Sequence, residues 1–262
     1  MSIARLSSRA LIRFSGLDWR TFLQGQLTQD VSTLQPGEAR FAALLTPQGR
    51  LMFDLFVVGF EDGAWLDIAA EHRDAMVQRM TLYRLRAKVD IAADDAPVLA
   101  AFDVDPVPGE GWVRDPRRPD LGWRGYGVAS ETDATEADYD AFRLAQGVPG
   151  PADWAGEKTY PIEANFDLLA GIDFKKGCFV GQETTSRMKR RGQIKNRMLP
   201  ITFDGPPPAY GAEVLAGTLR AGEVLSGVDG RAMALLRLDR IGGADLTVDG
   251  RSVRVERPDW IA

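Results

Sequence analysis

The chain has a single cysteine, Cys178, and a single histidine, His72, among its 262 residues. One thiol cannot close an internal disulfide, so a hydrophobic core rather than covalent cross-links has to hold the fold together. One thiol and one imidazole also cannot supply the ligands of a zinc site or an iron–sulfur cluster within one chain, so no metal site is expected. Cys178 is therefore a buried spacer, a reactive thiol, or a ligand that needs partners from another molecule.

The composition is that of an ordinary globular protein. Hydrophobic residues make up 45% and charged residues 26% of the chain, close to the averages for soluble domains. No apolar run approaches the ~20 residues that span a bilayer, and the first residues lack the apolar segment of a secretory signal. With the single thiol, these features predict a cytoplasmic protein without a membrane partner. No glycine-rich motif for ATP or a dinucleotide occurs.

The neighbours of Cys178 favour a reactive thiol. The cysteine lies in the run KKGCFVGQE, residues 175–183. Lysines before it and further cations after it stabilise a thiolate and lower the pKa of a thiol, and a helix beginning just downstream adds to this effect. Gly177 and Gly181 allow backbone N–H groups to approach a ligand. The alternative is a small hydrophobic residue in a buried strand, and the residue types alone do not decide between the two.

Positive charge is concentrated in residues 175–197. This segment contains eight Lys and Arg residues and one acidic residue, Glu183, although the whole chain has a net charge of −5. A basic strip on an acidic protein indicates a localised anionic ligand rather than general nucleic-acid binding, and a solvated helix face is the alternative. DNA is therefore not expected as a partner, and RNA is disfavoured because the strip lacks interleaved aromatic residues.

The pattern of apolar residues and turns predicts a mixed α and β chain followed by a part built of strands alone. Expected strands cover 6–14, 41–45, 51–60, 64–69 and two within 88–104, and expected helices cover 18–25, 71–86 and 134–147. Asp18 is expected to cap the first helix, and Met76, Met80 and Tyr83 to form one face of the second. Residues 105–120 are expected to form an exposed connection. After Pro206–Pro208, short strands with glycine turns predict a small β-barrel.

The cysteine run resembles the signature of the YgfZ-type folate-binding proteins, a family related to the aminomethyltransferase (T-protein) of the glycine cleavage system. The family pattern K-G-C-Y/F-x-G-Q-E-x-x-x-R-x-K/H-x-R-G is met at every fixed position from Lys176 to Gly192. Further segments resemble family motifs in the same order, namely LQGQLTQDV at 23–31, TPQGR at 46–50, IEAN at 162–165 and GIDF at 171–174. The resemblance spans roughly residues 3–240.

The resemblance implies an α+β fold in which two ferredoxin-like layers and a small C-terminal β-barrel surround a central folate cavity. Residues 1–197 would form the folate-binding region of two interleaved subdomains, and residues 198–262 the barrel. The implied cofactor is tetrahydrofolate or a related folate. The implied folate contacts are Glu163 on the pterin ring, Tyr139 and Arg143 on a nearby helix, Gln24 and Gln26, and Lys176, Gly177, Gly181, Gln182, Glu183, Arg187 and Lys189 of the cysteine segment. Three alternatives stay open, namely Glu163 as a surface carboxylate, Tyr139 as a core residue, and Gln24 and Gln26 as side chains that satisfy backbone groups.

Two functions follow from this resemblance. The first is a folate-binding accessory protein that supports assembly or repair of iron–sulfur enzymes through Cys178. Its clients would include radical-SAM tRNA-modifying enzymes, and we expect it to be non-enzymatic rather than an enzyme. Its partners would be iron–sulfur client or assembly proteins. The second is a folate-dependent aminomethyltransferase, which needs an aspartate near the folate nitrogen, and Asp74 is the alignable candidate. The cysteine signature belongs to the first class and favours it.

Overall fold

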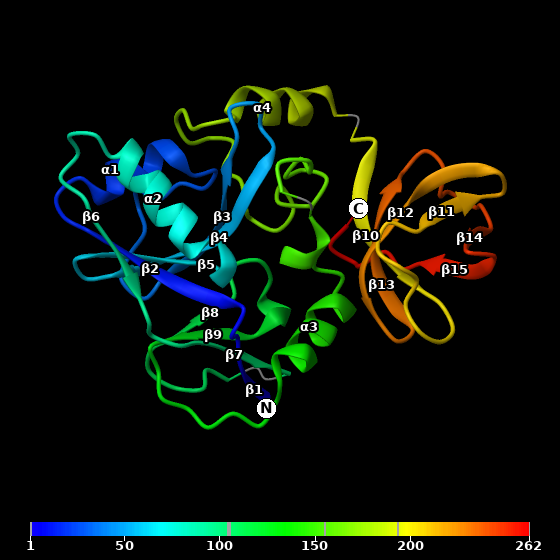
Figure 1. The fold of residues 1–262 in the computed structure, drawn as a ribbon, viewed down its shortest axis with the longest axis horizontal. Coiled ribbons are helices and arrows are strands. Elements are labelled where there is room, and N and C mark those ends of the chain that lie inside the picture. The colour runs from blue at the N-terminus through cyan, green and yellow to red at the C-terminus, as the bar shows by residue number, and fades with distance from the viewer. Residues whose placement is uncertain (1, 104–105, 155, 193, 262) are drawn as a thin grey trace.

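A computed structural model of the chain describes residues 2–103, 106–154, 156–192 and 194–261 (Figure 1). The helices are α1 (Trp19–Gln26), α2 (Arg73–Tyr83), α3 (Glu136–Ala145) and α4 (Gln182–Arg191), with 3-10 turns η1 (Ala70–His72), η2 (Pro119–Leu121) and η3 (Pro151–Asp153). The strands are β1 (Ser2–Arg5), β2 (Arg9–Ser15), β3 (Ala39–Leu45), β4 (Leu51–Phe60), β5 (Gly63–Ala69), β6 (Asp90–Asp94), β7 (Val98–Phe102), β8 (Trp112–Arg114), β9 (Trp123–Tyr126), β10 (Asn196–Thr202), β11 (Glu213–Ala216), β12 (Leu219–Val228), β13 (Arg231–Arg237), β14 (Leu246–Val248) and β15 (Arg251–Val255).

A five-stranded antiparallel sheet in the order β3-β4-β5-β2-β6 carries α1 and α2 on one face. Successive side chains of a strand face opposite sides of a sheet. Leu55 and Val57 of β4 therefore face the helices and join a core with Met76 and Met80 of α2. The intervening residues of β4, such as Phe56, face the opposite side and belong to a different core.

The second core lies between this sheet and a four-stranded sheet in the order β1-β7-β9-β8. Consecutive strands β1 and β2 belong to different sheets, and so do β6 and β7, so the two layers are interleaved along the chain. Helix α3 packs on β1 and β7. Its N-cap residue is Thr135, whose side chain forms a capping box with that of Asp138, which satisfies otherwise unpaired N–H groups of the first turn.

The C-terminal part is a closed barrel in the order β10-β13-β12-β11-β14-β15, completed by pairing of β10 with β15. Its interior is an apolar cluster of its own, and Figure 1 shows it beside the two sheets. Closure leaves no open sheet edge in the barrel. The α+β class with a C-terminal β-barrel, expected from the sequence, is therefore confirmed.

Three local expectations differ from the structure. Asp18 precedes α1 but does not cap it, because its carboxylate accepts a hydrogen bond from the backbone N–H of Lys88 at 2.7 Å. The second helix is shorter than 71–86, and its Tyr83 is 47% exposed while Met76 and Met80 are buried. The chain leaves this helix through Leu85, whose positive φ of 47° is incompatible with a continuing helix.

The stretch 105–120 is also more structured than an exposed connection. Residues 104 and 105 lie outside the described residues, but β8 pairs with β9 and the following residues Asp115 and Arg117 are buried. Charged residues enter the interior here because they pair with each other. In the described part of the chain, no helix is both long and apolar enough to cross a membrane.

Candidate functional site

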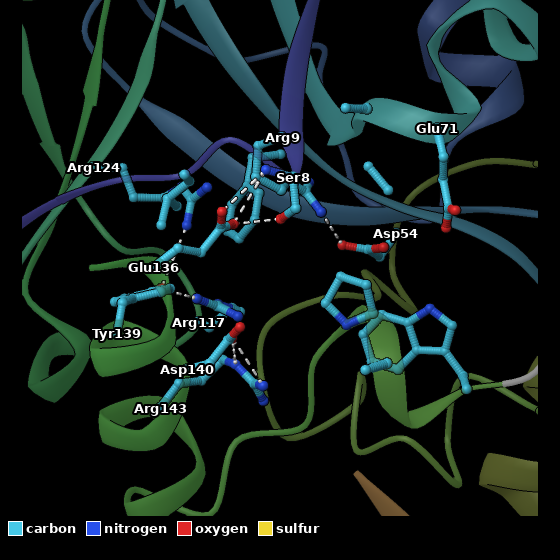
Figure 2. A pocket seen from close by; sticks show the side chains of 17 residues that line it. Ser8, Arg9, Asp54, Glu71, Arg117, Arg124, Glu136, Tyr139, Asp140 and Arg143 are labelled. Carbon is cyan, nitrogen blue, oxygen red and sulfur yellow. Dashed lines mark hydrogen bonds and ion pairs between the residues drawn. The ribbon is translucent and has the colours of Figure 1, made fainter. Parts of the chain in front are cut away.

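A cavity of about 400 Å³ lies between the two sheets, α3 and η3 (Figure 2). This volume is within the range of small-molecule sites. Aromatic side chains of the wall include Phe56, Tyr139 and Trp154. The charged lining residues are Arg9, Asp54, Glu71, Arg117, Arg124, Glu136, Asp140 and Arg143. An adjoining hollow of about 230 Å³ shares Asp54, Glu71 and Trp154 with the cavity.

Asp67 of β5 organises the charged wall behind the cavity. Its side chain is fully buried and its carboxylate accepts hydrogen bonds from Arg9 Nε at 2.6 Å, Arg124 Nη2 at 2.6 Å and the Tyr126 hydroxyl at 3.0 Å. Burial by itself raises the pKa of Asp67, but the Arg9 and Arg124 guanidinium groups outweigh it and hold the pKa below its usual value. The carboxylate therefore stays ionised and compensates two buried cations.

A second buried ion pair, Asp115 with Arg117, continues this wall toward α3. The two side chains make a bidentate contact at 3.0 and 2.7 Å, and Arg117 also donates to the Tyr139 hydroxyl at 2.8 Å. Burial raises the pKa of Asp115, but Arg117 and then Arg124 lower it by more, so that it lies below the usual value. The network thus fixes Tyr139, whose ring lines the cavity.

The ring of Phe56 lies among three guanidinium groups. The Cζ atoms of Arg124, Arg117 and Arg9 are 4.0, 5.0 and 5.6 Å from its centroid, an arrangement in which the ring face attracts cations. Asp54, two residues before Phe56 on the same face of β4, accepts from Arg9 Nη1 at 2.9 Å through Oδ2. Among the described residues no hydrogen bond to the other carboxylate oxygen, Oδ1, is found, so this oxygen can accept one from a ligand.

These charged residues were not predicted from the sequence, although a signal for two of them was present. Asp54 is the single charged residue of LMFDLFVVGF and Asp67 that of GAWLDIA, both strongly apolar strands. A lone charge in such a strand is not expected unless it is paired inside the protein. Asp67 lies opposite Phe56 on β4 and Leu11 on β2 in the register of the sheet, which places it at the centre of the inner face.

The rim of the cavity is more acidic and more open. Glu136 accepts hydrogen bonds from the backbone N–H of Ser8 at 3.2 Å and from the Ser8 hydroxyl. The side chain of Glu71 is 78% exposed, and that of Asp140 is 53% exposed and lies 3.1 Å from Arg143 Nη2. The cavity therefore combines an arginine-rich inner wall with carboxylates at its opening.

Cys178 lies in an exposed loop directly before α4. Lys176 and Phe179, on either side of it, point inward and are 8% and 7% exposed, whereas Gly177 and Cys178 are exposed. The thiol is therefore presented at the surface by two inward anchors and is not a buried spacer in a strand. Helix α4 begins at Gln182, so a helix N-terminus does follow the cysteine as expected.

The segment that resembles the N-terminal family motif forms the support of this loop. Thr28 accepts a backbone hydrogen bond from Asp173 at 3.0 Å and donates its hydroxyl to Gly171 O at 2.6 Å. Lys176 Nζ reaches carbonyl oxygens of the same segment. Gln24 shapes the segment from within, since its Oε1 accepts from Val31 N at 2.8 Å.

Two glycines make the loop fit against the turn between β3 and β4. Gly49 has φ +78° and Gly181 has φ +80°, a conformation that disfavours residues with a Cβ. A Cβ on Gly181 would lie 2.6 Å from Thr46 O and 3.0 Å from Gly49 Cα. Both glycines belong to segments that resemble family motifs, and the contact explains why no side chain fits at either position.

We expect Gly181→Ala to lower the free energy of unfolding by about 2 kcal/mol or more, because the left-handed conformation alone costs roughly 1–2 kcal/mol and the carbonyl contact adds to it. Gly177→Ala is the matched control, because a Cβ there meets nothing within 4 Å. Urea denaturation of both variants measures the difference. Equal stabilities would show that the turn yields to the extra methyl group.

Glu163 lies at the junction with the barrel and does not line the cavity. Its Oε1 accepts from Asn196 Nδ2 at 3.0 Å, and its backbone carbonyl accepts from Met198 N at 2.8 Å. Asn165, with a positive φ of 62°, donates its side-chain amide to Met198 O at 2.7 Å. The IEAN segment therefore docks the first barrel strand, which gives its polar residues a structural role.

Four of the eight cations of the basic strip, Arg187, Lys189, Arg190 and Arg191, lie on the exposed surface of α4, which Figure 1 shows at the top of the molecule, well away from α3. Lys176 and Arg197 of the strip are buried instead. Arg187 pairs with Glu183 at 2.6 Å, and Lys189 lies 3.6 Å from Asp167. Arg190 and Arg191 are exposed at the end of the helix, where cations interact favourably with the helix dipole.

The predicted site residues thus fall into two groups. Tyr139 and Arg143 line the cavity, whereas Glu163, Gln24, Gln26 and the predicted residues of the cysteine segment do not. The reason is that the cysteine loop and α4 pack on the β3–β4 turn and on residues 24–30, while α3 closes the cavity elsewhere. Asp74, the aspartate considered for aminomethyl transfer, is exposed in the first turn of α2 and is also absent from the cavity lining.

The fold and its barrel define an aminomethyltransferase-like architecture. The solved aminomethyltransferase T of the glycine cleavage system from Bartonella henselae superposes with a TM-score of 0.78 over 99% of this chain and 86% of its own, at 18% identity, a likeness of fold. Residues 195–262 match the family described as CAF17, C-terminal beta-barrel domain.

The chain belongs to the IBA57 family. The mouse protein named iron-sulfur cluster assembly factor IBA57, mitochondrial, is 30% identical over 98% of this chain and 84% of its own length. The homologue from Mycosarcoma maydis is 33% identical over 79% of this chain, which covers 59% of the length of that relative. Both relatives are named as mitochondrial, so the prediction of a cytoplasmic location is wrong.

Proposed function

We propose that this protein supports the assembly or repair of iron–sulfur clusters, with Cys178 as its reactive thiol and a folate in the cavity between the sheets. Its family supports the iron–sulfur role. The observation that carries the role of the thiol is its exposure on a loop held from both sides by buried anchors. The YgfZ-type signature supports the folate, and with it clients such as radical-SAM tRNA-modifying enzymes.

The chemistry of the cavity fits a folate. The pterin ring offers an amino group and ring N–H donors, and carboxylates such as Asp54 and Glu71 accept such donors in pairs. Aromatic walls from Tyr139 and Trp154 suit a flat ring. Arg143 suits the carboxylate end of the ligand. Bound in this way, a folate would supply one-carbon chemistry or simply stabilise the arrangement of the two sheets.

In this proposal the iron–sulfur cluster is cargo, and its ligands come from both this protein and a partner protein. Cys178 provides one thiolate ligand, and the described residues contain no group of three His, Cys, Asp or Glu side chains that could hold a metal ion. The remaining ligands therefore come from the partner. Exposed cations such as Arg190 and Arg191 lie at the end of α4, the helix that follows the cysteine loop, and favour an acidic partner surface, which speeds encounter.

Aminomethyl transfer is the weaker function. The fold is compatible with it, but Asp74 lies outside the cavity lining, and the cavity carboxylates come from other elements. A glycine-cleavage assay with the aminomethylated carrier protein distinguishes the two functions, since turnover would establish the transferase.

We expect Cys178→Ala to abolish support of iron–sulfur enzymes in cells that lack the native gene, because the exposed thiol has no substitute in the chain. The activity of a cluster-dependent enzyme is the measurement. Thr184→Ala, a change at a half-buried position of the same segment, is the control for disturbed folding. Full rescue by Cys178→Ala would remove the thiol from the proposal.

We expect tetrahydrofolate to quench the tryptophan fluorescence saturably, because Trp154 lines the cavity. Glu71→Gln should weaken binding about tenfold or more, since a hydrogen bond to a charged group contributes about 1.5–3 kcal/mol. Glu183→Gln, outside the cavity, should leave the affinity unchanged. Equal effects of the rim and control variants would show that the folate binds outside this cavity. A fluorescence change that does not saturate would show that the protein does not bind folate specifically.

A further inference from the structure

We propose that Lys176 is a positioning residue that latches the cysteine loop onto the end of α1, and that the thiol is presented correctly only while this latch is closed. The inference deepens the proposed function and rests on it for the role of Cys178. The contact between Lys176 and the end of α1 can be tested by itself, without any iron–sulfur assay.

The ammonium group of Lys176 is enclosed by main-chain carbonyls. Nζ donates to Gln24 O at 2.8 Å, Leu27 O at 2.6 Å and Gln29 O at 2.9 Å. A lysine ammonium carries three N–H donors and no acceptor, so these three bonds use all of them. Since the side chain is also largely buried, the group is bound in a fixed place rather than solvated at the surface.

Two of the three carbonyls belong to the end of α1. Gln24 is in its last turn and Leu27 is its C-cap residue. The last four carbonyls of a helix have no partner within the helix, and the negative end of the helix dipole favours a cation. Lys176 therefore caps α1 from 149 residues further along the chain. The segment of residues 24–29 and the cysteine segment are therefore joined by the hydrogen bonds of Lys176.

The geometry of the loop connects this latch to the thiol. Lys176 Nζ lies 5.4 Å from the ring centroid of Phe179, the second inward anchor. Only Gly177 and Cys178 lie between the two anchors, so fixing both ends leaves the thiol few positions. Asp173 holds the loop on the other side, as its Oδ1 accepts from the backbone N–H groups of Lys175 and Lys176 at 2.7 and 3.2 Å.

The neighbouring Lys175 provides a matched control. It carries the same charge, lies one residue away, and its side chain is exposed. Lys175→Met and Lys176→Met remove the same charge from the same segment, so any difference between them comes from the three carbonyl contacts.

Hydrogen–deuterium exchange of the full-length variants tests the latch. In Lys176→Met we expect at least tenfold faster exchange for the amides of residues 172–179 and 24–30, with unchanged exchange in the barrel, whereas Lys175→Met exchanges like the unmodified protein. Lys176→Arg keeps the charge, but a planar guanidinium cannot direct its donors at three converging carbonyls. It should show the same local loss, and it serves as the test if Lys176→Met does not fold. Unmodified protection in either folded variant overturns the latch.

A second measurement tests whether the latch acts through the thiol. In cells that lack the native gene, Lys176→Met should support a cluster-dependent enzyme as poorly as Cys178→Ala does. Lys175→Met should rescue. Full rescue by Lys176→Met would overturn the positioning role while leaving the exchange result in place. Full rescue by Cys178→Ala, in contrast, would count against the proposed function and not against the latch.

Discussion

Asp67→Ala is expected to unfold the protein or bring it close to unfolding. The carboxylate is fully buried and is bonded to the guanidinium groups of Arg9 and Arg124. Removing it leaves both cations buried without their main partner, and breaking a buried pair in this way costs about 3–5 kcal/mol. Since domains are stable by only about 5–15 kcal/mol, we expect a large shift of the urea midpoint.

Asp95→Ala is the control for Asp67→Ala. The Asp95 carboxylate also lies near an arginine, Arg73 at 2.8 Å, but its side chain is 92% exposed, and such pairs contribute about 0–1 kcal/mol. A similar loss for both variants would show that the buried network is not a main source of stability.

The network also predicts a pH dependence. The pKa values of Asp67 and Asp115 are lowered in the folded protein, so the unfolded chain binds more protons as acid is added. Their stabilisation is complete above the unfolded value of about 4 and is lost as the pH falls through the lower folded values. Asp67→Ala should therefore show a shallower loss of stability below pH 4 than the unmodified protein, in urea titrations at fixed pH.

The second large effect is expected for Asp167→Ala, at the junction of barrel and sheets. The buried carboxylate pairs with Arg197 of β10, with Oδ1 2.9 Å from Nη1 and Oδ2 3.0 Å from Nη2, and lies near Lys189. Its loss leaves Arg197, which is 7% exposed, without its carboxylate. The cost is again about 3–5 kcal/mol, concentrated where the barrel joins the rest of the protein.

We therefore expect Asp167→Ala to separate unfolding into two transitions and to increase proteolysis between α4 and β10. Asp239→Ala is the control, since it removes an ion pair with Arg237 on the exposed surface of the barrel. A single transition with an unchanged midpoint would contradict the assignment of Asp167 to the junction. Because Glu163 and Asn165 belong to the same junction, their substitution should lower stability in the same direction by a smaller amount.

Much of the fold was predictable because apolar periodicity and turn residues act locally. The strands flanking Pro47–Gly49, the burial of Met76 and Met80, and the helix containing Tyr139 follow from such patterns. The pattern of apolar residues could not predict that consecutive strands belong to different sheets, because pairing partners such as β1 and β7 are far apart in sequence. Tertiary contacts of this kind leave no periodic signal.

The candidate site was predictable in part for the same reason. The exposure of Cys178 agrees with one of the two interpretations that its neighbours left open, whereas the location of its loop relative to the cavity depends on the contact of Gly181 with the β3–β4 turn. The family resemblance placed Glu163 on a ligand, with a surface carboxylate as the alternative, whereas the structure places it on Asn196. A carboxylate serves either role, and only packing decides between them.

The cavity and the cysteine loop have no side chain in common. Substitutions in the cavity and in the cysteine loop can therefore accumulate independently during evolution. One relative could lose binding of the small molecule and keep the thiol, and another could lose the thiol and keep binding. Separation-of-function alleles should be obtainable in either direction, which makes this chain a suitable subject for a genetic dissection.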